Sequence, residues 1–182
     1  MSNRYEMRFG GTCGQGMMLL GDVLAYAAGI NSDKEIVLTK SYGPEARGSA
    51  CRSELITDDT MISYPVVSRP DFLLALSQMA CTQYTKDLAE DGVVLIDSDL
   101  VKEVPENAKT VYRLPITKIA EEATGKTLCA NMVALGAIAI LSRCASEDAV
   151  YDAMLHTLPA KILEINKVAF AAGAKAAKEL LQ

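Results

Sequence analysis

The residues best suited to bind a ligand form a glycine-rich turn between a short apolar stretch and a helical pattern. In this turn Gly10, Gly11, Gly14 and Gly16 surround Gln15. Glycine allows positive φ and close approach of backbone N–H groups to a ligand, and a helix N-terminus adds partial positive charge. The turn therefore suits a phosphate group, although its spacing matches neither GxGxxG nor GxxxxGK[ST]. A turn whose glycines permit close packing against a neighbouring strand or subunit explains the composition equally well.

A second candidate segment, KSYGPEARGS, occupies residues 40–49 and joins two predicted strands. Residues 34–52 carry four positive and two negative side chains, so this stretch is locally cationic in a chain whose net charge is −5. Such a loop favours an anion or an acidic neighbour. Because ligands bind at the carboxyl ends of strands in α/β sheets, the two segments could converge on one site. The simpler alternative is that Glu45 and Arg47 pair with each other on a surface loop.

The cysteines and the histidine argue against several kinds of catalytic centre. The five cysteines are far apart and form no CxxC pair, which excludes a ferredoxin-type cluster. The only histidine, His156, has no Cys/His ligand spacing around it and is expected on the surface, in the last turn of a helix. This leaves little basis for a zinc site or a Ser/His/Asp triad.

The hydrophobic pattern predicts the elements that must position these residues. Strands are expected at residues 4–10, 35–40, 50–57, 93–97 and 109–113, with helices at 15–28, 131–142, 147–155 and 161–181. An apolar run at 71–76 precedes a helix that starts after Ser77 and continues to Glu90. This alternation predicts a three-layer α/β/α fold with a mostly parallel sheet, made mixed by a hairpin at residues 50–64. Residues 131–142 are apolar on all sides and must be buried.

Composition limits the architecture and the partners. With 182 residues, half of them hydrophobic, the chain is expected to form a single domain, a sheet portion to about residue 115 followed by a helical portion. The acidic net charge argues against nucleic acid. The longest apolar stretch is about half of what a bilayer span requires, and the N-terminal residues lack the pattern of a signal peptide. The sequence therefore predicts a cytoplasmic protein.

Four segments carry a resemblance to a known family over about the first 100 residues. GGTCGQGMMLLGDVLAYAAG, SYGPEARGSACRSELI, YPVVSRPDFLLALSQ and GVVLIDSDLV, in this order, resemble the gamma subunit of 2-oxoacid:ferredoxin (acceptor) oxidoreductases. Tyr42 after Ser41, and Ala46 between Glu45 and Arg47, look more like 2-oxoglutarate-type members than pyruvate-type ones. Subunits of pyruvate-, branched-chain- or indolepyruvate-type enzymes remain alternatives. Cys13 and Ser49 depart from the family pattern, which has glycine at both positions.

The resemblance implies a fold like catalytic domain III of pyruvate:ferredoxin oxidoreductase and a chain that is active only in a complex. The complex would oxidatively decarboxylate 2-oxoglutarate to succinyl-CoA, with alpha, beta and ferredoxin-like delta subunits and ferredoxin or another acceptor. Thiamine diphosphate, Mg²⁺, iron–sulfur clusters and coenzyme A would lie on or with those subunits, and this chain alone would bind none of them. The resemblance gives Cys13 no role. A stand-alone nucleotide- or CoA-binding module is the alternative from another class.

The residues expected to face a partner-bound phosphate group, or to lie at the subunit junction, come from the two candidate segments. No catalytic residue and no metal ligand is assigned to this chain. The expected contact residues are Gly10, Gly11, Gly14, Gln15, Gly16, Tyr42, Glu45 and Arg47.

Overall fold

A six-stranded sheet in the order β2-β3-β1-β4-β5-β6 organises the chain. The computed structural model describes residues 3–30, 32–42 and 50–182. The strands are β1 (Tyr5–Thr12), β2 (Glu35–Ser41), β3 (Ala50–Asp58), β4 (Phe72–Ala75), β5 (Val93–Asp97) and β6 (Thr110–Leu114). The helices are α1 (Met17–Gly29), α2 (Gln78–Tyr84), α3 (Ile116–Thr124), the short 3-10 helix η1 (Thr127–Cys129), α4 (Ala130–Leu141), α5 (Glu147–Thr157) and α6 (Ala160–Leu180).

The sheet is mixed and mostly parallel, as predicted. Strands β1, β4, β5 and β6 run parallel as neighbours, and β3 runs antiparallel to both β1 and β2. The predicted hairpin at residues 50–64 is wrong, because β1 and β2 occupy both edges of β3 and leave no place for a return strand. Side chains hold the following segment instead. The guanidinium of Arg4 donates hydrogen bonds to the carbonyls of Tyr64 at 3.1 Å and Val66 at 3.0 Å.

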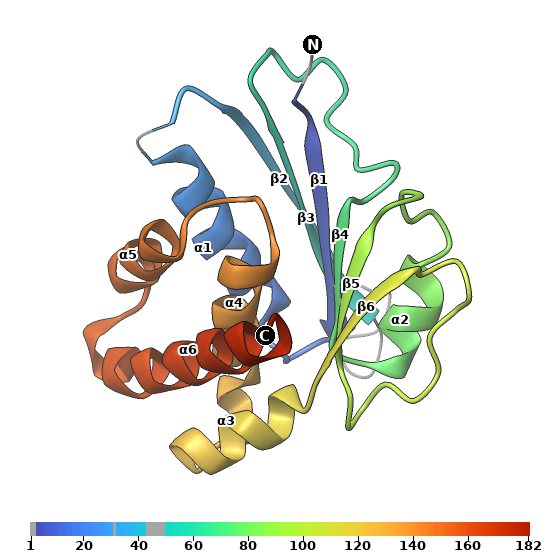
Figure 1. Ribbon diagram of the computed structural model, residues 1–182. Coiled ribbons are helices and arrows are strands. Elements are labelled where there is room, and N and C mark those ends of the chain that lie inside the picture. The colour runs from blue at the N-terminus through green and yellow to red at the C-terminus, as the bar shows by residue number, and fades with distance from the viewer. Residues whose placement is uncertain (1–2, 31, 43–49) are drawn as a thin grey trace.

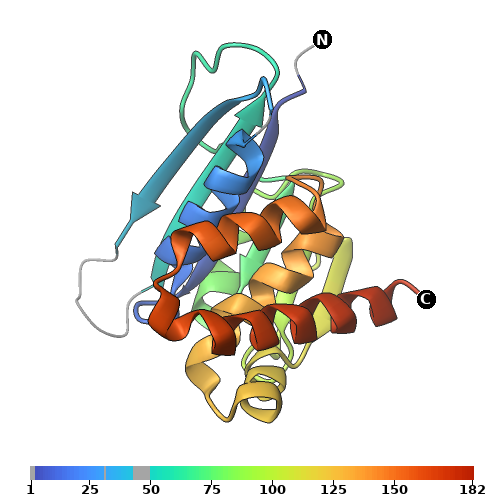
Figure 2. The ribbon, with the colours of Figure 1, turned by 90° about the vertical axis from the view of Figure 1, so that its left-hand side faces the viewer.

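Helices cover both faces of the sheet and give the predicted three layers (Figure 1). Helices α1, α4, α5 and α6 lie over one face, where Figure 2 shows them in front of the strands, and α2 lies on the other face. The right-hand strands β4 and β5 are buried on both faces, since their side chains contribute alternately to the two core clusters. No helix among the described residues is long and apolar enough to span a membrane.

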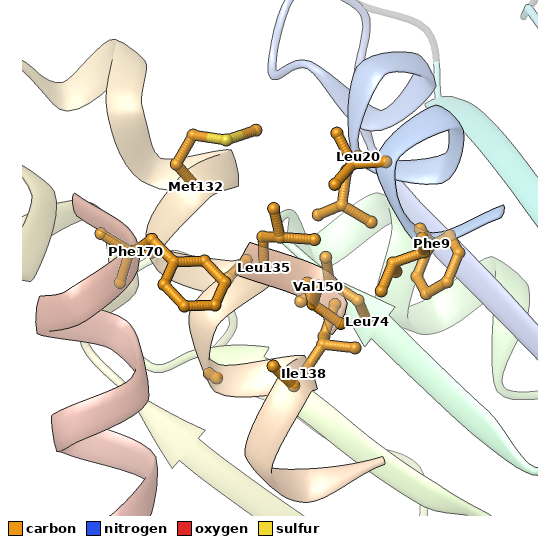
Figure 3. Close-up of a cluster of buried hydrophobic side chains, with 14 of the residues drawn as sticks. Phe9, Leu20, Leu74, Met132, Leu135, Ile138, Val150 and Phe170 are labelled. Carbon is orange, nitrogen blue, oxygen red and sulfur yellow. The ribbon is translucent and has the colours of Figure 1, made fainter. Parts of the chain in front are cut away.

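The larger core cluster lies between the sheet and the helices of the thicker layer (Figure 3). Helix α4 is at its centre, and residues 130–139 of this helix are all buried, as the apolar pattern requires. Helix α6 crosses α4 closely: a Cβ added at Gly136 would lie 2.9 Å from the backbone nitrogen of Ala174, so only glycine permits the contact. The expected division of the chain near residue 115 stays a prediction.

Helix α2 ends earlier than its sequence pattern predicts. The pattern favours helix over residues 77–90, but the helix ends at Tyr84. The guanidinium of Arg8, only 3% exposed, donates to the carbonyl of Tyr84 at 3.3 Å and pairs with Asp87 at 2.5 Å. It also pairs with buried Glu54 at 2.6 Å. A buried arginine from β1 therefore binds the carbonyl of Tyr84, the residue at which α2 ends.

Candidate functional site

The glycine-rich turn lies at the carboxyl edge of the sheet, between the end of β1 and the start of α1. Gly14 has φ of +106° and Gly16 has φ of +77°, so both adopt the left-handed conformation that favours glycine. Gly16 is the N-cap of α1 and has no side chain to cap the helix. The predicted helix starts at Met17 rather than at Gln15. The turn thus leaves N–H groups of the first helical turn free of side-chain caps at this edge.

At three of the four glycines, an added Cβ would lie closer than 3.0 Å to a side chain of the same chain. A Cβ at Gly10 would lie 2.5 Å from the nearest ring carbon of Tyr84 and 3.1 Å from Cβ of Ala80. A Cβ at Gly11 would lie 2.7 Å from Oε1 of Gln15, and one at Gly16 would overlap the side chain of Asn131. These contacts favour the alternative in which the glycines permit close packing. Gly14 differs, because a Cβ there would meet no atom of the described residues within 4 Å.

Gln15 connects the two strands between which a ligand would be expected. Its Oε1 accepts a hydrogen bond from the N–H of Thr12 at 2.7 Å, and its Nε2 donates to the carbonyl of Leu76 at 3.1 Å. Thr12 ends β1, and Leu76 follows β4, which is the parallel neighbour of β1. Because α1 and α2 leave these strands on opposite faces, this is the crevice where open α/β sheets hold ligands. In this chain the amide side chain of Gln15 bridges the crevice, and Gln15 therefore positions the glycine-rich turn.

Two hollows flank the exposed Gly14. One, of about 230 Å³, is lined by residues that include Gln15, Leu100, Thr117 and Leu128. The other, of about 200 Å³, is lined by residues that include Cys13, Met18, Tyr42 and Cys51. Leu128 is 76% exposed, Tyr42 is 69% exposed and Leu100 is 42% exposed. We call Gly14 and these three apolar side chains the Gly14 rim; exposed apolar groups gathered in this way are typical of a contact surface for another protein.

The structure brings only part of the second candidate segment to this site. Tyr42 lines the same hollow as Gly14, whereas Glu45 and Arg47 lie outside the described residues. Two of the four positive side chains of residues 34–52 have acidic partners. Lys40 pairs with Asp22 at 2.6 Å, and Arg52 lies 3.4 Å from Glu54, which also pairs with Arg8. These carboxylates neutralise part of the local excess of positive charge.

A disulfide links the glycine-rich turn to β3, the strand that follows the second candidate segment, and sequence reasoning missed it. Cys13 of the glycine-rich turn is bonded to Cys51 of β3, with their Cα atoms 5.2 Å apart. Strand register explains the contact, because Thr12 lies opposite Ala50 and Gly11 lies opposite Cys51. The pairing could have been found only by predicting that the strands at residues 4–10 and 50–57 are antiparallel neighbours. The resemblance gives Cys13 no role, whereas in the structure Cys13 is bonded to Cys51.

The remaining candidates for chemistry take part in ordinary packing. His156 is exposed in the last turn of α5, as predicted, and its ring stacks on that of Tyr26 with centroids 4.8 Å apart. Cys81, Cys129 and Cys144 are free and buried. Burial raises the pKa of Cys144 to about 12 and also raises the pKa of Cys81. In the described part of the chain, no three His, Cys, Asp or Glu side chains are grouped so that they could hold a metal ion.

Comparison with known proteins assigns the chain and its fold to a family. The sequence model of the pyruvate ferredoxin/flavodoxin oxidoreductase family matches residues 6–176. The 2-oxoglutarate synthase subunit KorC of Methanocaldococcus jannaschii is 44% identical over 179 residues, which cover 97% of this chain and 96% of that protein. The pyruvate synthase subunit PorC of Methanothermobacter marburgensis, a more distant relative, is 31% identical and is matched over 88% of this chain and 90% of its own length.

A solved structure agrees with this assignment. The keto/oxoacid ferredoxin oxidoreductase gamma subunit from Geobacter sulfurreducens superposes with a TM-score of 0.86 at 41% identity, covering 97% of this chain and 98% of that one. Sequence and fold match over almost the whole length of both chains, and the glycine-rich turn lies within the matched region. The chain therefore belongs to the pyruvate ferredoxin/flavodoxin oxidoreductase family.

Proposed function

We propose that this chain is the gamma subunit of a 2-oxoglutarate:ferredoxin (acceptor) oxidoreductase, which converts 2-oxoglutarate and coenzyme A to succinyl-CoA and CO2. The observation that carries the proposal is the 44% identity, over nearly the full length of both chains, to a 2-oxoglutarate synthase subunit. The identity to a pyruvate synthase subunit is 31%. The chain works with alpha, beta and ferredoxin-like delta subunits, in the cytoplasm, as a single domain.

In this proposal the chain supplies shape and contact surface rather than a reacting side chain. Thiamine diphosphate, Mg²⁺, iron–sulfur clusters and coenzyme A lie on or with the partner subunits, and they supply decarboxylation, electron transfer and acyl transfer. The only histidine of the chain stacks on a tyrosine of α1, and its free cysteines are buried. The Gly14 rim offers exposed backbone and apolar side chains of the kind that a neighbouring subunit contacts.

The glycine-rich turn and residues 42–47 contribute differently to this junction. Gly14 approaches the partner-bound phosphate group, and Tyr42 packs beside it, with Glu45 and Arg47 at the same subunit junction. Gly10, Gly11, Gln15 and Gly16 maintain the shape of the turn. Support for this division comes from the exposure of Gly14, whereas the amide of Gln15 is bound to backbone on both sides.

Affinity purification of the tagged full-length chain from its own cells tests the assignment. We expect partner subunits with clustered cysteines and a thiamine diphosphate motif to co-purify, identified by mass spectrometry. The purified chain alone should bind neither coenzyme A nor a nucleotide in calorimetry. Micromolar binding of either ligand by the isolated chain, with no such partners, would contradict the proposal and favour a stand-alone binding module.

A further inference from the structure

We propose that the Cys13–Cys51 disulfide is a redox-active site, opened by dithiol reductants through attack on the sulfur of Cys13. The two sulfurs differ in access. Cys51 is only 3% exposed, whereas Cys13 is partly exposed and belongs to a turn at the surface. An incoming thiolate therefore reaches Cys13, and Cys51 is the leaving group. Both residues line the 200 Å³ hollow beside Gly14, which gives a small reductant its path.

The position of the Cys13–Cys51 disulfide favours thiol–disulfide exchange. Gly16 and Met17, at the start of α1, line the same hollow as the disulfide, and the N-terminus of this helix carries a partial positive charge. Such a charge stabilises a thiolate, both as nucleophile and as leaving group. The other wall of the hollow includes Tyr42 and Met18. A cysteine of the glycine-rich turn and a cysteine of β3 thus meet at the edge of the sheet, next to an uncapped helix end.

The other three cysteines are unsuited to thiol–disulfide exchange. Cys81, Cys129 and Cys144 are buried and free, and the raised pKa values of Cys81 and Cys144 keep these thiols protonated at neutral pH. Protonated buried thiols neither attack a disulfide nor exchange with it. Cys129 is buried as well, so among the described cysteines the Cys13–Cys51 pair is the one that a reductant in solution reaches.

A dithiol reduces the Cys13–Cys51 disulfide, and a small disulfide oxidises the two thiols again. A reductant thiolate attacks Sγ of Cys13, the Cys13–Cys51 bond breaks, and Cys51 leaves as a thiolate that takes up a proton. The second thiolate of the reductant then attacks its own sulfur in the mixed disulfide and releases Cys13. The protein gains two electrons and two protons, and the reductant becomes a cyclic disulfide. A low-molecular-weight disulfide such as oxidised glutathione reverses the reaction.

The Cys13–Cys51 disulfide restrains the Gly14 rim. The effect of this restraint on partner binding rests on the proposed function. The disulfide ties the glycine-rich turn to β3 on one side, while Gln15 ties it to the end of β4 on the other. A turn fixed at both ends loses less conformational freedom when a partner binds. Disulfides in a reducing cytoplasm are usually transient and catalytic or redox-sensing. Oxidation is therefore expected to strengthen assembly with the partner subunits, and reduction to weaken it.

Thiol counting on the full-length chain tests the site itself. After treatment with oxidised glutathione and then denaturation, three of the five cysteines should titrate as thiols; after native incubation with dithiothreitol, all five should. Peptide mapping with a thiol-specific alkylating reagent should assign the difference to Cys13 and Cys51. Five thiols after oxidation, or a bond that opens only in denaturant, would overturn the proposal.

Variants separate this proposal from the proposed function. Binding of the partner subunits should be tighter by about fivefold or more for the oxidised than for the reduced chain. Cys51→Ser and Cys13→Ser should lose this redox dependence, whereas Cys144→Ala, which removes a buried thiol elsewhere, should keep it. Circular dichroism melts check that each variant is folded. Partner binding that is equal in both redox states of the wild-type chain contradicts the redox role, while absence of any partner binding contradicts the gamma-subunit assignment.

Discussion

At the scale of single residues, Gln15 shows how a predicted ligand residue can instead be part of the framework. Its type and its place in a glycine-rich turn suggested a contact with a cofactor. The structure directs both ends of its amide to backbone groups of Thr12 and Leu76. The sequence located the turn, because the glycine pattern is local. It could not predict these hydrogen bonds, because Leu76, just after β4, is distant in sequence.

Replacing Gln15 with alanine is expected to destabilise the chain. Gln15→Ala leaves the N–H of Thr12 and the carbonyl of Leu76 without their side-chain partner, which costs about 1–3 kcal/mol for each buried group that water does not reach. Guanidinium titration of the wild-type and variant chains measures this loss. Gln83→Ala, at an exposed position of α2, is the matched control and should change the free energy of unfolding by less than about 0.5 kcal/mol. Equal stability of the two variants would contradict the bridging role.

At the scale of elements, the predictions that rest on local sequence patterns were confirmed. The predictions that depend on contacts between distant segments were wrong. Ser77 was predicted as an N-cap, and its hydroxyl accepts from the N–H of Ala80 at 3.2 Å. The apolar pattern of residues 131–142 correctly predicted the buried helix α4. The length of α2 was wrong because buried Arg8 binds its last turn, and the hairpin after β3 was wrong because β1 and β2 fill both edges of that strand. These contacts join distant segments and leave no local pattern.

The crossing of α4 and α6 gives a prediction at this scale. A Cβ at Gly173 would lie 2.9 Å from Cα of Val133, so Gly173→Ala must push the two helices apart. Overpacking of this kind costs about 1–3 kcal/mol, and we expect a corresponding loss in thermal or denaturant unfolding. Gly29→Ala makes the same chemical change where the nearest atom lies 3.6 Å away, and it should leave stability nearly unchanged. A Gly173→Ala chain as stable as the wild type would show that the helices can separate freely.

At the scale of the whole molecule, the carboxyl edge of the sheet collects the features that sequence identified separately. The glycine-rich turn and Tyr42 meet there, as expected from the rule for α/β sheets. The disulfide between Cys13 and Cys51 could not be predicted, since it depends on the pairing of β1 with β3. The apolar character of the Gly14 rim was also missed, because Leu100 follows β5 and Leu128 belongs to the short helix η1, both distant in sequence from the turn.

The Gly14 rim predicts where partner subunits bind. Leu128→Asp places a charge on a side chain that is 76% exposed, so the fold should be unaffected while the dissociation constant for the partner subunits rises by about tenfold or more. Met61→Asp is the control, at a residue that is 83% exposed beyond the opposite end of β3. Surface plasmon resonance with the immobilised partner subunits measures both. Equal affinities for the two variants would place the interface elsewhere.

Turnover of 2-oxoglutarate by the partner subunits, with and without this chain, tests the gamma-subunit assignment most directly. The assay follows CoA-dependent reduction of ferredoxin or a viologen dye. Adding the chain should raise the rate with 2-oxoglutarate by at least about tenfold, equivalent to about 1.4 kcal/mol in the barrier, and kcat/KM should be higher for 2-oxoglutarate than for pyruvate. An unchanged rate, or a preference for pyruvate, would contradict the assignment.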